Sequence, residues 1–123
     1  MKSNAFGDVV RERRVELRLS LRAFAEAAGM DPGNASRIER GQASPPQATD
    51  VLRRIATALQ FKKKSRDYVH LFDLAAAAKG RVPQDLMSDD EVAARLPILF
   101  RTLRNKALSK AQFEKLIESI RKA

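Results

Sequence analysis

The sequence predicts an all-α protein, and three observations support that class. Apolar residues recur three and four positions apart along most of the 123-residue chain, which is the period of one helix face. The alternation of apolar and polar residues that marks a strand is nearly absent. Serine, aspartate, proline and glycine stand where helices of this period would begin and end. We expect a helical domain in residues 1–64 and a further helical region in residues 65–123.

The amino-terminal helices have the clearest end signals. Ser20 is expected to cap the second helix and Gly29 to end it, because glycine readily adopts positive φ. Asp31 and Pro32 restart the chain as a third helix, since aspartate accepts hydrogen bonds from free N–H groups and proline has no N–H to leave unpaired. The first four helices are expected at about residues 7–18, 21–28, 32–40 and 47–59.

The carboxy-terminal helices show the same kinds of signal. Ser88 and Glu91 have the spacing of a capping box, and so do Ser109 and Gln112. Pro97 is expected to end the helix that Ser88 opens, because proline lacks an N–H for the helical ladder. The expected helices are 65–79, 88–97, a turn or short helix through 104, and a last helix with the stripe Phe113, Leu116, Ile117 and Ile120.

Positive charge is concentrated in the amino-terminal half. The chain has 24 Lys and Arg against 15 Asp and Glu, a formal net charge of +9. Residues 1–66 hold 14 basic and 7 acidic side chains, a net of +7, whereas residues 67–123 hold 10 and 8, a net of +2. Basic side chains that contact phosphates release counterions and gain affinity, so this half favours a nucleic acid as partner. The basic run 62–66 is either a phosphate-contacting segment or a solvated turn.

Few side chains suited to catalysis or metal binding are present. The chain has no cysteine, which excludes disulfides and thiolate sites, and its only histidine is His70. The acidic residues 89–91 stand at an expected helix start, where the helix dipole accounts for them. We expect no enzyme activity, no metal and no cofactor. No leader pattern and no uncharged 18-residue stretch occurs, so we expect a cytoplasmic protein without a membrane partner.

A short turn joins the second and third expected helices. It consists of Gly29, Met30 and Asp31, and Ala25 stands four positions before the glycine. A small residue there allows the second helix of a crossed pair to pack closely, and glycine allows a sharp turn. In pairs of this kind the second helix lies in the major groove of DNA while the first crosses the backbone.

A set of residues around this turn resembles a known family. The set consists of Leu19, Ser20, Ala25, Gly29, the run Ser36-Arg37-Ile38-Glu39-Arg40-Gly41, and Pro45. It resembles the Xre family of helix-turn-helix proteins, which includes the DNA-binding domains of phage Cro and repressor proteins, over about residues 6–61. The resemblance implies a five-helix Cro/repressor-like domain that binds double-stranded DNA, as a dimer on a palindromic operator.

The resemblance also assigns roles to individual residues. Arg14 and Glu39 match a buried ion pair, and Ala35 and Ile38 face the core. Base-reading positions are Pro32, Gly33, Asn34 and Arg37, and phosphate-contacting positions are Ser20, Arg22, Arg40 and Gln42. Asparagine pairs with adenine and arginine with guanine through two hydrogen bonds each.

The chain departs from the family pattern at several of these places. Pro32 and Gly33 stand where polar side chains commonly read bases, so direct readout rests on Asn34 and Arg37. The alternative for Arg37 is a surface salt bridge, and for Asn34 a helix surface without a partner. Arg13 replaces a common leucine, and we expect its stem to cover apolar surface while its charged head stays in water. Leu21 replaces a common glutamine.

Two functions remain open for the whole chain. The first is a dimeric transcriptional regulator, most simply a repressor, whose carboxy-terminal helices form the dimer. The second is an antitoxin that represses its own operator and binds a toxin protein with those helices. Residues 96–102 also resemble tails of Xre regulators that a metallopeptidase cleaves, which implies a regulatory peptidase as partner and a cleavage site at 105–107 or 80–81.

Overall fold

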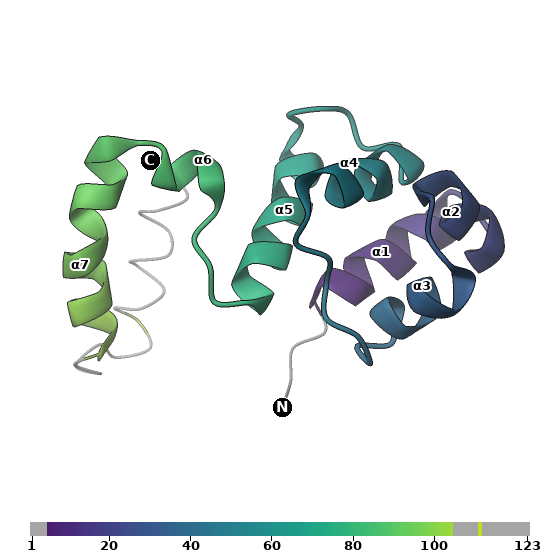
Figure 1. Ribbon diagram of the computed structural model, residues 1–123, viewed down its shortest axis with the longest axis horizontal. Coiled ribbons are helices and arrows are strands. Elements are labelled where there is room, and N and C mark those ends of the chain that lie inside the picture. The colour runs from purple at the N-terminus through teal and green to yellow at the C-terminus, as the bar shows by residue number, and fades with distance from the viewer. Residues whose placement is uncertain (1–4, 105–110, 112–123) are drawn as a thin grey trace. The chain divides into compact units, whose positions relative to one another are not determined.

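The computed structural model describes residues 5–104 and 111, and all regular elements in this part of the chain are helices (Figure 1). The all-α class is therefore confirmed. The helices are α1 (Ala5–Glu16), α2 (Leu21–Ala28), α3 (Pro32–Glu39), α4 (Thr49–Ala58), α5 (Arg66–Ala78), α6 (Gln84–Met87) and α7 (Asp90–Arg104). They divide into two compact units, here called unit 1 and unit 2, with the boundary between Pro83 and Gln84.

The helix ends around the short turn form as the sequence indicates. Ser20 Oγ accepts a hydrogen bond from the N–H of Ala23 at 3.0 Å and caps α2. Gly29 ends α2 in the left-handed region at φ +67°. Asp31 Oδ2 accepts from the N–H of Asn34 at 3.1 Å and caps α3. These local hydrogen bonds satisfy amide groups that the helices themselves leave unpaired.

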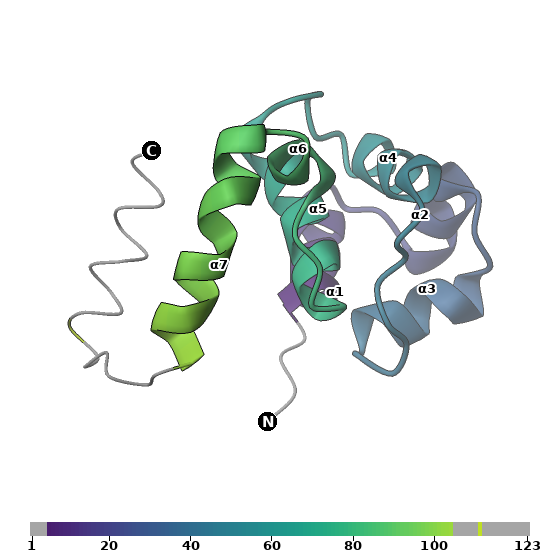
Figure 2. The same ribbon diagram turned by 60° about the vertical axis from the view of Figure 1, so that its left-hand side comes forward.

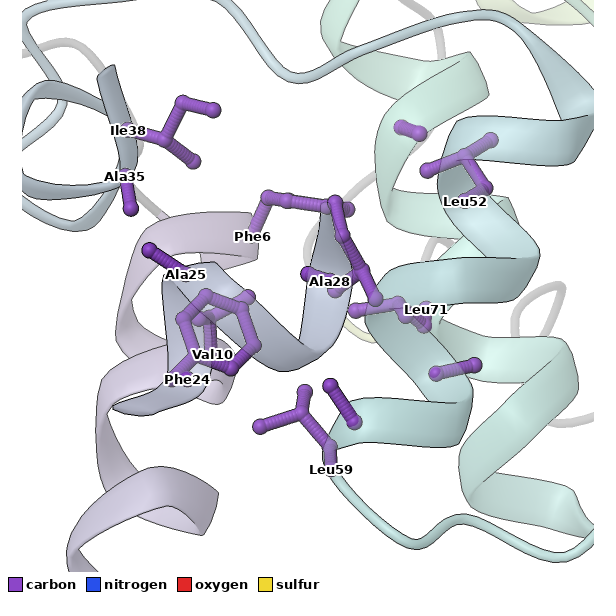
Figure 3. Packing of buried hydrophobic residues seen from close by; sticks show 14 residues of the cluster. Phe6, Val10, Phe24, Ala25, Ala28, Ala35, Ile38, Leu52, Leu59 and Leu71 are labelled. Carbon is purple, nitrogen blue, oxygen red and sulfur yellow. The ribbon is translucent and has the colours of Figure 1, made fainter. Parts of the chain in front are cut away.

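One hydrophobic cluster forms the core of unit 1, and all five of its helices contribute to it. The buried side chains point towards one another between the helices (Figure 3). They are Phe6, Val10, Phe24, Ala25, Ala28, Ala35, Ile38, Leu52, Ile55, Ala56, Ala58, Leu59, Leu71 and Ala75. α3 packs against α1 and α2 at the edge of unit 1, so one of its faces remains open to solvent (Figure 1 and Figure 2).

The division of the chain differs from the expected boundary between residues 64 and 65. Leu71 and Ala75 of α5 are 0% and 1% exposed within the core of unit 1. Gln47, just before α4, donates from Nε2 to the carbonyl of Ala75 at 2.8 Å. α5 therefore belongs with the first four helices, because the core of residues 5–64 is completed only by its apolar face.

Unit 2 corrects two expectations about helix ends. α7 continues through Pro97, although a helix end was expected there. Proline removes only one ladder hydrogen bond, and the 15-residue helix keeps its bonds on either side. The cap of α7 is Asp89, whose Oδ1 accepts from the N–H groups of Glu91 and Val92 at 3.0 and 3.2 Å. Ser88 instead donates to the carbonyl of Gln84 at 2.8 Å.

Two sequence expectations fall outside the described residues. These are the last helix, with its stripe Phe113, Leu116, Ile117 and Ile120, and the proposed cleavage segment at 105–107. Within the described part of unit 2, no side chain of α6 or α7 is buried.

Candidate nucleic-acid interface

The turn between α2 and α3 is held by backbone hydrogen bonds of a Schellman motif. The N–H of Met30 donates to the carbonyl of Ala25 at 2.9 Å, and the N–H of Gly29 donates to that of Glu26 at 3.1 Å. This pattern requires the left-handed conformation that Gly29 adopts. The turn sets the angle between α2 and α3 and thereby the direction of the exposed face of α3.

An arginine of α4 supports the same turn. Arg54 Nε donates to the carbonyl of Ala28, the last residue of α2, at 3.1 Å. A Cβ on Gly29 would lie 3.4 Å from that Nε, so the arginine packs directly against the glycine. Arg54 also pairs with Asp50 at 3.4 Å. Sequence reasoning missed the role of this arginine at the turn, because the carbonyl that it binds is 26 residues away in sequence.

α3 has one buried and one exposed face. Ala35 and Ile38 are 1% and 5% exposed, which confirms that they face the core. Of the expected base-reading residues, Pro32, Gly33 and Arg37 are exposed and Asn34 is half-buried. All four lie on the first two turns of α3, so the structure brings them together on one helix.

Two charged side chains lie close to Gly33 in the first turn of α3. A Cβ built on Gly33 would stand 2.9 Å from Oδ2 of Asp31 and 3.6 Å from Nη1 of Arg37. The guanidinium of Arg37 therefore lies over the first turn of α3. Within the described residues, the side chain of Arg37 makes no hydrogen bond or ion pair with the protein, so its donors are available to a ligand.

Arg14 of α1 and Glu39, the last residue of α3, form an ion pair. Arg14 Nε donates to Glu39 Oε2 at 2.7 Å and Arg14 Nη2 to Oε1 at 3.0 Å. Arg14 Nη1 also donates to the carbonyl of Leu19 at 2.8 Å. The two side chains are 17% and 5% exposed. This arrangement ties α1, the segment before α2 and the end of α3 to one buried group of charges.

The four expected phosphate contacts are all exposed, and they come from two places. Ser20 and Arg22 lie at the start of α2, while Arg40 and Gln42 follow the end of α3. The hydroxyl of Ser20 accepts from a backbone N–H as the cap of α2 and keeps its own hydrogen to donate. Arg40 Nε makes only a long bond of 3.4 Å, to the carbonyl of Ser36.

Arg13 behaves differently from the expectation that its head stays in water. Its Nε donates to the carbonyl of Leu59 at 2.9 Å, and its guanidinium carbon lies 5.4 Å from the ring centroid of Phe61. Its Nη1 also pairs with Glu16 at 3.1 Å. Arg13 therefore joins α1 to the end of α4, because the carbonyl there needs a donor and the ring face attracts a cation.

The basic run 62–66 forms the connection between α4 and α5. Lys62, Lys63 and Lys64 are exposed, and Lys64 has φ +65°. Ser65 caps α5 by accepting from the N–H of Tyr68 at 3.2 Å. The segment is an exposed connection before α5, which suits either a phosphate-contacting segment or a solvated turn.

Metal-binding clusters and membrane-spanning helices are both absent from the part of the chain that the structure describes. No group of three or more His, Cys, Asp or Glu side chains there is arranged to hold a metal ion. No described helix has the length and apolar character needed to cross a bilayer.

Comparison with known proteins agrees with the geometry of unit 1. The model of the helix-turn-helix domain family matches residues 5–69, which is more than half of the chain. No curated protein and no solved structure matches the chain. The match covers α1 to α4, the turn at 29–31 and the exposed face of α3, and it supports DNA as the binding partner. The chain belongs to the helix-turn-helix domain family.

Proposed function

We propose that the protein is a sequence-specific regulator of transcription that binds double-stranded DNA with α3 in the major groove. The observation that carries the proposal is the solvent-facing side of α3, where the side chain of Arg37 is exposed and that of Asn34 half-buried, on a helix whose start is capped by Asp31. Side chains in these positions suit contacts with base edges. Direct readout then comes from these two residues, with Pro32 and Gly33 allowing close approach of the backbone.

Contacts with the DNA backbone complete this proposed interface. Ser20 and Arg22 lie at the start of α2, where N–H groups and the helix dipole favour an anion. Arg40 and Gln42 lie beyond the other end of α3. Phosphate contacts on both sides of α3 would fix its position along the groove without contributing sequence preference.

Membership of the Xre family, with its five-helix Cro/repressor-like domain, is the finer form of this proposal. It is supported by the Arg14–Glu39 ion pair and by the five helices of unit 1. In that family a dimer binds two half-sites about 34 Å apart, since one recognition helix alone contacts too few base pairs for useful affinity. We propose a homodimer that represses by occupying a palindromic operator, formed through residues beyond the first unit.

An antitoxin is the second candidate, and exposed apolar side chains in unit 2 are compatible with it. Ile98, Phe100 and Leu103 of α7 are 66%, 43% and 41% exposed within the described structure. Apolar side chains at a surface suit a protein partner, which in this account is a toxin. The same side chains suit a second copy of the chain, and a regulatory peptidase remains a third kind of partner.

Selection of bound fragments from genomic DNA, followed by salt titration, tests the main proposal. The expected result is a recurring palindrome whose affinity exceeds that of random duplex by at least about a thousandfold. Equal affinity for all duplexes would contradict sequence-specific regulation.

The mass of the native complex separates the two candidates. The full chain is purified from its host without and with crosslinking, and the masses of the complexes are measured. A homodimer alone supports the regulator, whereas a stoichiometric second protein supports the antitoxin.

A further inference from the structure

Gly33 stands in the first turn of α3, and two charged side chains lie close to the space that a side chain at this position would occupy. The carboxylate of Asp31 lies 2.9 Å from the position of a Cβ, and the guanidinium of Arg37 lies 3.6 Å from the same position. Gly33 itself is exposed to solvent. The gap over this glycine therefore opens on the solvent-exposed face of α3.

The geometry of a helix explains why Arg37 reaches this gap. Residues four apart lie on the same face, and helical side chains tilt towards the amino terminus of the helix. Arg37 follows Gly33 by four positions, so its side chain runs back over the first turn. A longer side chain at position 33 would occupy the same surface.

Asp31 is a fixed neighbour of the guanidinium. Its Oδ2 accepts the N–H of Asn34 at 3.1 Å, which holds the carboxylate at the start of the helix. The opposite charges of Asp31 and Arg37 attract across the gap without forming a direct ion pair. Arg37 is thus drawn towards the amino end of α3 and still keeps its N–H donors available.

We infer that Gly33 is a specificity-determining residue, because its missing side chain lets Arg37 present its guanidinium to a guanine at the amino end of α3. This inference rests on the proposed function, since it requires α3 in the major groove. The first residues of a recognition helix are those that reach base edges. A guanidinium there donates two hydrogen bonds to O6 and N7 of guanine, whereas glycine contributes none.

The experiment measures base preference at each operator position for the full-length protein and its variants. Arg37→Ala is expected to lower the preference for guanine at one position of each half-site about tenfold. Gly33→Met is expected to lower the same preference by a similar factor although Arg37 is present, since the methionine side chain covers the first turn. Gly33→Ala should retain most of it, because its Cβ makes only ordinary contact with Arg37 at 3.6 Å. The carboxylate of Asp31, 2.9 Å from that Cβ, has to shift to accommodate the methyl group.

Two further variants control for folding and for chemistry. Ala27→Met places the same side chain on an exposed position of α2 and should leave base preference unchanged. Gly33→Gln repeats the test with a second long side chain in case Gly33→Met does not fold, which thermal unfolding of each variant establishes. Glutamine should lower the preference for guanine and favour adenine in its place.

The possible outcomes separate this inference from the proposed function. Unchanged guanine preference in Gly33→Met or Gly33→Gln, when folded, overturns the role of Gly33 and leaves sequence-specific binding intact. Unchanged preference in Arg37→Ala overturns the assignment of guanine to Arg37. Absence of any preferred sequence for the unaltered protein overturns the proposed function and the inference together.

Discussion

Arg14 and Glu39 form a two-point ion pair that joins α1 to the end of α3, with N–O distances of 2.7 and 3.0 Å. Glu39 places a negative charge at the carboxyl end of a helix, which the helix dipole disfavours. The guanidinium of Arg14 neutralises that charge and also donates to the carbonyl of Leu19. One buried arginine thus links the helix that carries the proposed base contacts to two other parts of unit 1.

Arg14→Ala is expected to lower the free energy of unfolding by about 3–5 kcal/mol, because the buried carboxylate of Glu39 would lose the guanidinium that neutralises its charge. Urea titration measures the loss. Arg11→Ala, which removes an exposed arginine from the same helix, is the matched control and should change stability by under about 0.5 kcal/mol. A loss under about 1 kcal/mol for Arg14→Ala would contradict the structural importance of the pair.

Arg22→Ala is expected to weaken binding to operator and random duplex equally, because a phosphate contact carries no sequence information. The slope of log affinity against log salt concentration should fall by about 1. Affinities at several salt concentrations check this. A loss confined to the operator would show instead that Arg22 reads a base.

Asn34→Ala is expected to cost about 1–3 kcal/mol of operator binding and to relax the preference for adenine at one position. The measurement is a competition between operators that differ at single base pairs. Thermal unfolding of the variant accompanies it, because Asn34 is half-buried and its backbone N–H belongs to the cap of α3. Equal losses on operator and random DNA would contradict base reading by this residue.

Arg54→Met is expected to destabilise unit 1 by about 1 kcal/mol, since the carbonyl of Ala28 loses a charged hydrogen-bond donor that is partly exposed. Hydrogen exchange of the Gly29 and Met30 amides should accelerate, because the turn loses its support from α4. Arg53→Met removes the neighbouring exposed arginine and serves as the control. Similar exchange rates in the two variants would exclude a special role for Arg54.

Leu71→Ala is expected to lower the free energy of unfolding of unit 1 by about 2–5 kcal/mol, because the leucine is fully buried against the other helices. Val69→Ala, on the same helix but 41% exposed, should cost far less. Calorimetry measures the loss of unfolding free energy in each variant. Equal small effects would mean that α5 is not part of the core and would restore the boundary near residue 64.

Much of the fold follows from local sequence signals. Ser20, Gly29 and Asp31 mark the ends of α2 and α3, because a cap or a left-handed turn depends on a few neighbouring residues. The inward positions of Ala35 and Ile38 are those that the family resemblance implies. Two features could not be predicted from the sequence. The boundary between the units depends on the packing of α5 against the other helices, and α7 continues through Pro97 because the other hydrogen bonds of a long helix outweigh the one that proline removes.

The candidate site also has features that the sequence predicts and features that depend on the tertiary structure. The sequence by itself determined the class of the fold, the turn between α2 and α3, and the identity of the exposed residues on α3. Only the tertiary structure decided where two long arginine side chains go: Arg13 to the carbonyl of Leu59 and Arg54 to the carbonyl of Ala28. An arginine has many rotamers of similar energy, so its position is selected by acceptors and spaces that other segments bring near it.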